Sequence, residues 1–366
     1  MKIAVLKETR QNENRVALTP SVCSQLIKQG FECLVEQGAG YNSNFDDSVY
    51  ENAACKIVSK EEALTTAQIV IKVNPLSDEE INTIKEGAAC ISYLYASTHP
   101  ELVQKLAAKN ISAFSMDAIP RISRAQNMDA LSSQGNLAGY KAVILGANHL
   151  CKIFPLMMTA AGTITPSRVL IYGAGVAGLQ AVATAKRLGA IVECTDVRPD
   201  TKEQVESLGA KFIQVNTEEV AKVEGGYAKE VSEDYLQKQK EAVDKSLFQA
   251  DLVIATALVM GKKAPVLITE AQVKKMKLGS VIVDMAVEQG GNCTLSEHDK
   301  VITKYGVTIV GKSDFASSLA QNASELFAKN IQNLLIHLAN KDGFKWEMEE
   351  EITKGTLITH QGKILK

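Results

Sequence analysis

Residues 168–196 read RVLIYGAGVAGLQAVATAKRLGAIVECTD, and this stretch decides the fold of the chain. An apolar run leads into three glycines with the spacing G-x-G-x-x-G, at Gly173, Gly175 and Gly178. A helical pattern and a second apolar run follow, and that run ends at Asp196. In such a strand–turn–helix–strand unit the first glycine makes the tight turn, the second lets the backbone approach a pyrophosphate, and the third lets helix and strand pack closely. The pattern predicts a Rossmann-type unit that binds a dinucleotide at the start of its helix.

The acid at the end of the second strand indicates which dinucleotide is preferred. A carboxylate at Asp196 can bond the ribose hydroxyls and disfavours a 2′-phosphate, so NAD(H) is expected in preference to NADP(H). Arg198 complicates this expectation, because a nearby arginine can accept that phosphate; with Asp196 present, we expect Arg198 to pack on or near the adenosine. The glycine spacing alone is a weak signal, and the alternative is a glycine-rich turn in an α/β domain that binds no nucleotide.

Outside this stretch, strand-like and helix-like segments alternate along almost the whole chain. We expect strands at 2–6, 32–36, 68–73, 89–95 and 111–116 in a first block, and at 169–172, 191–195, 211–215, 252–256, 280–286 and 307–311 in a second. Long helical patterns at 126–151 and 318–340 bracket the second block. The alternation predicts an α/β fold of two Rossmann-like domains with mostly parallel sheets, joined by long helices with a cleft between them. The expected domains are an N-terminal Rossmann-like domain, 1–130 plus 320–366, and an NAD(H)-binding Rossmann domain, 131–319.

The composition argues against several classes of protein. The 40 basic and 42 acidic residues leave a net charge of −2, which does not suggest a nucleic-acid surface or a polybasic membrane anchor. No run approaches the roughly 18 apolar residues of a membrane span, and the N-terminus does not have the form of a signal peptide. Seven cysteines without a C-x-x-C pair fit a reduced cytosolic interior, with Cys23, Cys33 and Cys90 as core residues. The five histidines show no ligand spacing, so no metal site is expected.

A polar segment precedes the first long helix. It runs from Arg121 to Gln134 and places Asp129, Ser132 and Ser133 on one helical face, where Arg121 and Arg124 could fold back onto Asp129. The pattern alone favours a helix N-terminus with capping groups and a surface ion pair. The functional alternative is a polar patch that grips a nicotinamide carboxamide.

Two further observations bear on the chemistry. The segment 217–235, with Gly225-Gly226-Tyr227, has many charges and little apolar periodicity, and it is predicted to be a long exposed loop, either a lid or a floppy insertion. The sequence shows neither a convincing general base near the glycine loop nor a nucleophile triad, although dehydrogenases of hydroxy or amino acids need a proton acceptor. Hydride transfer between two nicotinamides needs only two rings held face to face.

Several stretches resemble a known family, the NAD(H)-binding component of proton-translocating nicotinamide nucleotide transhydrogenases. They are Lys7–Thr9 and Asn14–Pro20, the segment Arg121–Lys141, and Gly173–Arg198 with Val281–Cys293. The resemblance implies that the 121–132 segment lies over the nicotinamide ring and bonds its carboxamide through Arg121, Asp129 and Ser132, with Gln126 reaching towards the partner nucleotide. It also implies a nucleotide site lined by the glycine loop with Val176 and Ala177, by Asp196, Val197 and Arg198 at the adenosine, by Gly226 and Tyr227 on a mobile loop, and by Gln239 and Leu258.

The same resemblance implies an activity and an assembly. Hydride would pass directly from NADH on this chain to NADP⁺ on a partner subunit, coupled to proton translocation by membrane partners. The implied partners are an NADP(H)-binding subunit and a membrane-spanning proton-channel subunit, with no nucleic acid. A homodimer is implied as well, and the apolar face of the 318–340 helix could serve it. The expected location is cytoplasmic, peripheral to the inner membrane through the partners.

Two other functions remain open. Alanine dehydrogenases are related and share the Arg15 and Lys72 segments, and their mechanism resembles one in which a lysine and a histidine activate the keto acid. Here the histidine position is Tyr95, and the position of their aspartate is Glu288. These departures argue against alanine oxidation. The third possibility is an NAD(H)-sensing or scaffold module without catalysis.

Overall fold

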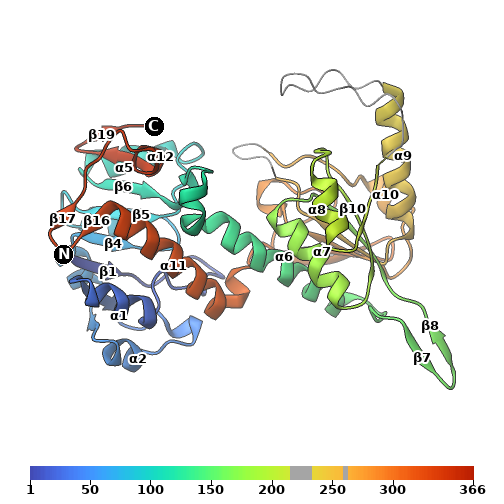
Figure 1. The fold of residues 1–366 in the computed structure, drawn as a ribbon, viewed down its shortest axis with the longest axis horizontal. Helices are drawn as coiled ribbons and strands as arrows, with labels where there is room; N and C mark the ends of the chain where they lie inside the picture. Colours follow the sequence, from blue (N-terminus) through green and yellow to red (C-terminus); the bar gives the residue numbers. More distant parts are fainter. Residues whose placement is uncertain (215–232, 259–262) are drawn as a thin grey trace. The chain divides into compact units, whose positions relative to one another are not determined.

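A computed structural model describes residues 1–214, 233–258 and 263–366 of the chain (Figure 1). The chain divides into two compact units. Unit 1 comprises Met1–Gly135 together with Ala316–Lys366, and unit 2 comprises Asn136–Phe315. Helix α6 (Ala130–His149) begins in unit 1 and continues in unit 2, whereas helix α11 (Ala320–Leu338) lies in unit 1.

Unit 1 is built on an eight-stranded sheet with the strand order β19-β18-β6-β5-β4-β1-β2-β3. Six strands are parallel: β1 (Lys2–Val5), β2 (Glu32–Glu36), β3 (Lys56–Val58), β4 (Ile69–Ile71), β5 (Ala89–Ser92) and β6 (Ser112–Ser115). The C-terminal strands β18 (Leu357–His360) and β19 (Lys363–Ile364) extend the sheet in antiparallel fashion beside β6. The order reverses between β1 and β4, and in doubly wound sheets ligands bind at the carboxyl ends of the strands at such a point.

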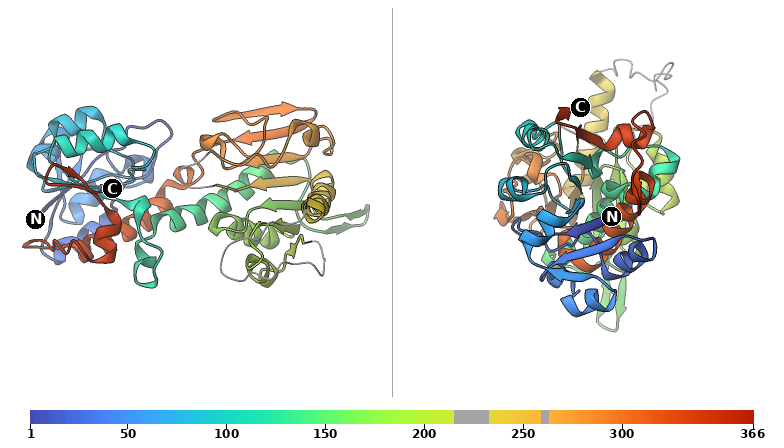
Figure 2. Two further views of the ribbon diagram at one scale, coloured as in Figure 1. Left: turned by 90° about the horizontal axis from the view of Figure 1, so that it is seen from above. Right: turned by 90° about the vertical axis from the view of Figure 1, so that its left-hand side faces the viewer.

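The helices of unit 1 cover both faces of this sheet, so its strands are apolar throughout (Figure 2). One face packs against α1 (Pro20–Lys28), α2 (Asp47–Asn52), α11 and α12 (Glu351–Thr356). The other face packs against α3 (Lys60–Thr66), α4 (Asp78–Thr83) and α5 (Pro100–Ala108). Short elements complete the unit: η1 (Tyr41–Ser43), η2 (Met116–Ala118), η3 (Ser123–Met128), η5 (Ser317–Leu319), β16 (Ala339–Asn340) and β17 (Gly343–Phe344).

Unit 2 is built on a seven-stranded sheet with the order β11-β10-β9-β12-β13-β15-β14. The parallel strands are β9 (Arg168–Tyr172), β10 (Ile191–Thr195), β11 (Lys211–Phe212), β12 (Leu252–Ala255), β13 (Val281–Asp284) and β15 (Val307–Gly311). Strand β14 (Lys300–Lys304) is an antiparallel edge. The strand order reverses between β9 and β12, so the glycine loop after β9 lies where this architecture binds ligands.

Helices also cover both faces of the sheet of unit 2. The core of one face includes residues of α6, α7 (Val176–Arg187) and α8 (Thr201–Ser207). The core of the other face includes residues of α9 (Glu233–Gln249) and α10 (Glu270–Val273). The unit also contains η4 (Val287–Gln289) and a separate two-stranded hairpin, β7 (Met157–Thr159) and β8 (Gly162–Ile164), which projects from it (Figure 1).

The predicted fold class, two Rossmann-like α/β units with mostly parallel sheets, is confirmed. Three element predictions need correction. The expected helix at 126–151 is a 3₁₀ turn followed by α6 from Ala130, because Asp129 caps the helix there. The C-terminal tail, beyond the long helix, contains strands of the main sheet. The apolar face of α11, which could have served a homodimer, is buried in the core of unit 1 through Phe327, Ile331 and Leu334.

Other sequence expectations concern single residue types. Cys23, Cys33 and Cys90 are buried as expected, and Cys151 is the exposed cysteine. Within residues 1–214, 233–258 and 263–366, no helix combines the length and apolar character needed to cross a membrane. The same described residues contain no cluster of three or more His, Cys, Asp or Glu side chains arranged to hold a metal ion.

Candidate functional site

The glycine loop of unit 2 has the geometry that its spacing predicts. Gly173 follows β9 with φ +97°, a conformation that L side chains rarely adopt. A Cβ on Gly178 would lie 1.8 Å from the Gly173 carbonyl oxygen, so α7 can approach the strand only with a glycine there. A Cβ on Gly175 would meet nothing within 4 Å. The second glycine therefore borders open space, as required if phosphates approach the backbone here.

The start of α7 faces this open side without a side-chain cap. Gly175 is the N-cap residue, and no side chain bonds the first turn of the helix. Val176, the first residue of α7, is 40% exposed, and Ala177 follows it. Because the first amides of a helix carry partial positive charge, an uncapped N-terminus beside an open glycine fits a pyrophosphate.

Asp196 follows β10 and joins the glycine loop to Arg198. Its Oδ2 accepts a hydrogen bond from the Ala174 amide at 2.7 Å. Arg198 donates to the same carboxylate from its backbone N at 2.8 Å, from Nε at 3.0 Å and from Nη2 at 3.0 Å. Burial opposes ionisation, but the hydrogen bonds from Arg198 and Ala174 outweigh it and lower the pKa of Asp196. Asp196 is therefore ionised at neutral pH, and the Arg198 guanidinium, which was expected on or near the adenosine, is bonded to it.

The neighbouring strand β12 supplies a second wall that the sequence did not reveal. The Thr256 hydroxyl donates to the Tyr172 carbonyl at 3.0 Å, beside the glycine loop. Asn292 is fully buried, and its amide accepts from the Ala257 backbone N at 3.1 Å and donates to the Ala257 carbonyl at 2.9 Å. Asn292 follows two glycines that were interpreted only as a turn. The signal that could have indicated it is an amide placed after the end of β13, the next strand of the sheet.

The remaining predicted residues of the nucleotide site are found in different states. Val197 is 98% exposed and Leu258 is 50% exposed, in the segments that follow β10 and β12. Gln239 lies on α9 and donates to the Ile213 carbonyl at 3.0 Å. Gly226 and Tyr227 lie outside the described residues, as does most of the expected 217–235 loop. Within that range, Glu233 begins α9, so its last residues are helical.

The polar segment that was predicted to contact nicotinamide lies in unit 1, at the start of α6. The Asp129 carboxylate accepts from the Ser132 backbone N at 2.9 Å and from the Ser132 hydroxyl at 2.6 Å, which is helix capping. Arg121 and Gln126 are exposed. Arg124 does not fold back onto Asp129, because its Nη2 pairs with Glu350 at 2.8 Å. That contact spans most of the chain and could not be predicted from the local pattern.

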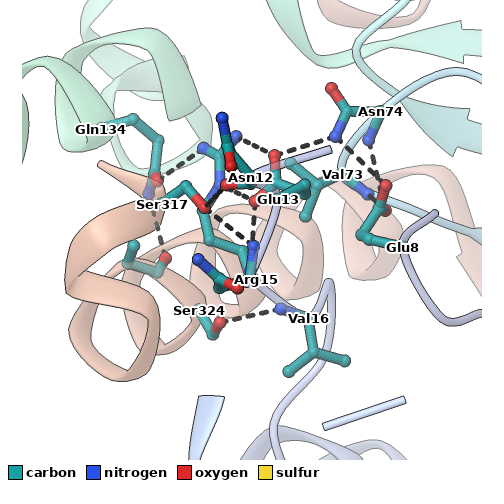
Figure 3. Close-up of polar contacts among 12 residues, drawn as sticks. Glu8, Asn12, Glu13, Arg15, Val16, Val73, Asn74, Gln134, Ser317 and Ser324 are labelled. Atoms are coloured by element: carbon teal, nitrogen blue, oxygen red, sulfur yellow. Dashed lines mark hydrogen bonds and ion pairs between the residues drawn. The ribbon is translucent and has the colours of Figure 1, made fainter. Parts of the chain in front are cut away.

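A buried polar network in unit 1 was not predicted (Figure 3). Glu8, just beyond β1, accepts from the Val73 amide at 2.7 Å and from the Asn74 side chain at 3.1 Å. Asn74 also donates to Glu13 at 2.9 Å, and Glu13 holds Arg15 through two contacts of 2.7 and 2.6 Å. Burial raises the pKa of Glu8 to about 6. The signal for this network is that polar residues directly follow strands whose carboxyl ends meet at the reversal of the sheet.

The network continues from Arg15 into α6. Arg15 Nη1 donates to the Gln134 side chain at 2.9 Å, and Gln134 donates in turn to the Ala323 carbonyl of α11 at 3.0 Å. The hydroxyls of Ser317 and Ser324 bond the backbone of the 12–16 segment, accepting from Asn14 at 2.8 Å and from Val16 at 2.9 Å (Figure 3). These contacts fix the N-terminal loop against α11.

Lys72, the match to the alanine dehydrogenase lysine, is engaged elsewhere. It is 2% exposed, and its ammonium lies 2.9 Å from the carboxylate of the fully buried Glu80 on α4. Its neighbours in sequence, Ile71 and Val73, belong to the core on the opposite face of the sheet from α4. Lys72 therefore faces away from Arg15, whose polar network lies with Val73. Tyr95, at the histidine position, is 40% exposed.

A doubly wound sheet with a glycine loop at the reversal of strand order, an open helix N-terminus and an ionised aspartate after the next strand define a dinucleotide-binding Rossmann unit, and the chain combines it with a second unit of similar architecture. Comparison with known proteins identifies the family. The N-terminal domain model of alanine dehydrogenase/PNT matches residues 4–138, and the C-terminal domain model matches residues 142–366. The chain belongs to the alanine dehydrogenase/PNT family.

Individual relatives fall on both branches of this family. The chain is 52% identical to an NAD(P) transhydrogenase subunit alpha of Rhodospirillum rubrum, over 100% of this chain and 98% of the relative. It is 30% identical to alanine dehydrogenase of Bacillus subtilis, over 100% of this chain and 92% of the relative. A solved structure of transhydrogenase from Sinorhizobium meliloti matches with a TM-score of 0.91 and 42% identity, over 100% of both chains. The resemblance to the transhydrogenase branch that the sequence indicated is confirmed.

Proposed function

We propose that the chain is the NAD(H)-binding subunit of a proton-translocating transhydrogenase and that hydride passes from its NADH to NADP⁺ on a partner subunit. The observation that carries the proposal is the full-length similarity to NAD(P) transhydrogenase alpha subunits, at 52% identity over essentially the whole relative. The geometry of unit 2 supports the nucleotide-binding role, because Gly175 leaves open space at an uncapped helix N-terminus.

In this proposal unit 2 holds the nucleotide. The amides at the start of α7 bind the pyrophosphate, with Val176 and Ala177 lining it. Asp196 bonds the adenosine ribose, with Val197 and Arg198 beside it. Gly226, Tyr227, Gln239 and Leu258 complete the lining. Asn292 and Thr256 fix the segment that carries Leu258 by bonding the backbone on either side of the glycine loop.

The residues assigned to the nicotinamide end act by position and charge. The Asp129 carboxylate, held by Ser132, accepts a hydrogen bond from the carboxamide NH₂ group, and Arg121 supplies a donor for the carboxamide oxygen. Gln126 reaches towards the second nucleotide. The hydride leaves one nicotinamide ring with its electron pair and joins the other, so no protein group has to accept a proton.

The buried lysine makes alanine oxidation the weaker candidate. A keto-acid mechanism needs a lysine free to meet the substrate. Here Lys72 forms a buried ion pair with Glu80, and freeing it would leave a buried carboxylate without its partner. Tyr95 cannot replace a histidine as a proton carrier near neutral pH.

The proposal includes an assembly. Its partners are an NADP(H)-binding subunit and a membrane-spanning proton-channel subunit, which would hold the chain at the cytoplasmic face of the inner membrane. The proposal also includes a homodimer. Its support in this chain is the β7–β8 hairpin, which exposes four large apolar side chains, Leu156, Met157, Met158 and Ile164.

The test is single-turnover hydride transfer from NADH on the purified protein to NADP⁺ on an NADP(H)-binding transhydrogenase subunit. We expect transfer in the wild type and a fall of at least tenfold in the double variant Arg121→Ala, Asp129→Ala. Arg124→Ala is the matched control, because Arg124 lies in the same segment but pairs with Glu350. Wild-type rates in the double variant would discard the roles given to these residues.

Two other outcomes would replace the proposal itself. NADH formation from alanine and NAD⁺ without any partner would identify an alanine dehydrogenase. Tight NADH binding without transfer to any cognate partner would identify a sensing or scaffold module.

A further inference from the structure

The carboxyl edge of the sheet in unit 1 carries a buried tyrosine hydroxyl that its neighbours do not satisfy. Strands β1, β4 and β5 end side by side there, and the residues beyond β1 and β4 bond each other through Glu8 and Asn74. Tyr93 follows β5 and extends the ladder, donating its backbone amide to the Val73 carbonyl at 3.0 Å. Its hydroxyl is buried and has no hydrogen-bond partner among the described residues.

An unpaired buried hydroxyl is costly. The whole Tyr93 residue is 4% exposed, so water does not compensate for the missing bond. Leaving a buried donor unsatisfied costs about 1–3 kcal/mol, and a phenylalanine of the same shape would avoid this cost. Buried polar groups in native proteins are nearly always paired, so an exception calls for a ligand or a function.

The surroundings of Tyr93 connect it with the residues assigned to nicotinamide. Its ring packs against Phe327 of α11 and Tyr95, with centroid distances of 5.3 and 5.6 Å. Burial raises its pKa well above the ordinary value, and the charges of Arg15 and Asp129 both act on it. The phenol therefore stays protonated, in the vicinity of the Asp129 carboxylate, as a fixed hydrogen-bond donor.

A primary carboxamide requires two kinds of partner. Its NH₂ group needs an acceptor, and its carbonyl oxygen needs one or two donors. Asp129 is an acceptor only, and it already receives two hydrogen bonds from Ser132. Tyr93 contributes a donor that lies on a strand end rather than in the exposed 121–128 segment.

We propose that the Tyr93 hydroxyl is a further positioning group of the nucleotide site, which donates a hydrogen bond to the carboxamide oxygen of the bound nicotinamide. The proposal rests on the proposed function, because it takes the assignment of Asp129 to the carboxamide as given. Because the hydroxyl has no solvent contact here, the ligand must displace a covering side chain. Tyr95, whose ring stacks on Tyr93 and is 40% exposed, is the neighbour that can yield its place.

The test compares two ligands on the purified chain, NADH and ADP-ribose, which lacks the nicotinamide. In Tyr93→Phe we expect the affinity for NADH to fall about tenfold and the affinity for ADP-ribose to stay unchanged. The melting temperature of the ligand-free variant should equal or exceed that of the wild type, since the substitution removes an unsatisfied group. The proposal is overturned if NADH affinity is unchanged, or if both ligands lose affinity equally.

A matched control is Tyr50→Phe. The Tyr50 hydroxyl is also fully buried, but it donates to the Leu18 carbonyl at 2.8 Å. This variant should lose stability and keep both affinities. A second measurement uses the thionicotinamide analogue of the dinucleotide, whose sulfur is a weaker acceptor. It should bind the wild type less tightly than NADH and bind Tyr93→Phe equally well; an equal difference in both proteins would refute the proposal. Failure of the proposed function itself shows separately, as a wild type that does not prefer NADH to NADPH.

Discussion

The carboxylate of Asp196 accepts three hydrogen bonds from Arg198 and one from the Ala174 amide, so one negative charge is shared between a cation and the glycine loop. Arg198 remains 56% exposed along its side chain, which leaves it accessible to a ligand. The two residues have opposite effects on a 2′-phosphate, which the acid repels and the base attracts. The outcome depends on whether the acid is present to hold the guanidinium.

We expect Asp196→Asn to shift the preference from NADH towards NADPH. The substitution removes the repulsion of a 2′-phosphate and weakens the hold on Arg198, which can then pair with that phosphate. The ratio of the two dissociation constants, measured by titration, should change by at least tenfold. Asp200→Asn changes the net charge equally in the same exposed loop and should leave the ratio unchanged. An unaltered ratio in the first variant would mean that Asp196 does not set the specificity.

Single residues differ in how far the sequence predicts them. Gly173, Gly178 and Asp196 were predicted because their spacing within one βαβ unit imposes their geometry. Asn292 and Glu8 were not, because their partners lie on other strands and meet only in the folded sheet. Arg124 was misassigned for the same reason, since Glu350 is far away in the sequence.

At the scale of elements, the buried parallel strands and long helices were the predictable features. Strands such as β9 and β12 are continuous apolar runs because helices cover both faces. The missed strands are short or exposed: β14 has lysines at both ends and lies on an edge, and β7 and β8 are fully exposed. For α11 the periodicity correctly gave an amphipathic helix, but periodicity does not say whether the apolar face meets its own core or another molecule.

The turn between β9 and α7 allows a paired test of two glycines. In Gly175→Ala the new methyl group meets nothing within 4 Å, so the fold should be unaffected, but the methyl group projects into the space assigned to the pyrophosphate. We expect unchanged thermal stability and at least a tenfold loss of affinity for both NADH and ADP-ribose. In Gly178→Ala the methyl group would lie 1.8 Å from the Gly173 oxygen, so the protein should lose about 1–3 kcal/mol of stability. Undiminished binding in Gly175→Ala would place the phosphates elsewhere.

At the scale of the whole molecule, the exposed apolar residues of the β7–β8 hairpin call for an explanation. Met158 is 76% exposed and Leu156 is 55% exposed, although these side chains gain free energy on leaving water. The hairpin forms its own two-stranded sheet and gains no pairing from the main sheet of unit 2. Such isolated hairpins are marginal in water unless another surface covers them.

We therefore expect Met158→Glu to weaken the proposed homodimer. A charge in an apolar interface must be desolvated, so the dissociation constant should rise by about 100-fold or more. Sedimentation velocity over a range of concentrations measures this shift. Val301→Glu is the control, because Val301 is an exposed apolar residue of unit 2 outside the hairpin. Equal masses for the wild type and Met158→Glu at every concentration would rule out this hairpin as the dimer contact.

The orientation of Lys72 determines what an amino-acid dehydrogenase built on this scaffold would require. Adjacent residues of an extended chain alternate between faces of a sheet, whereas residues two apart share a face. A cation meant to join the network of Arg15 would therefore have to come from position 74, where Asn74 now bonds Glu8, rather than from position 72. Drift from one activity of this family towards the other would thus pass through the strand end after β4, and changes at Lys72 itself would only damage the core beneath α4.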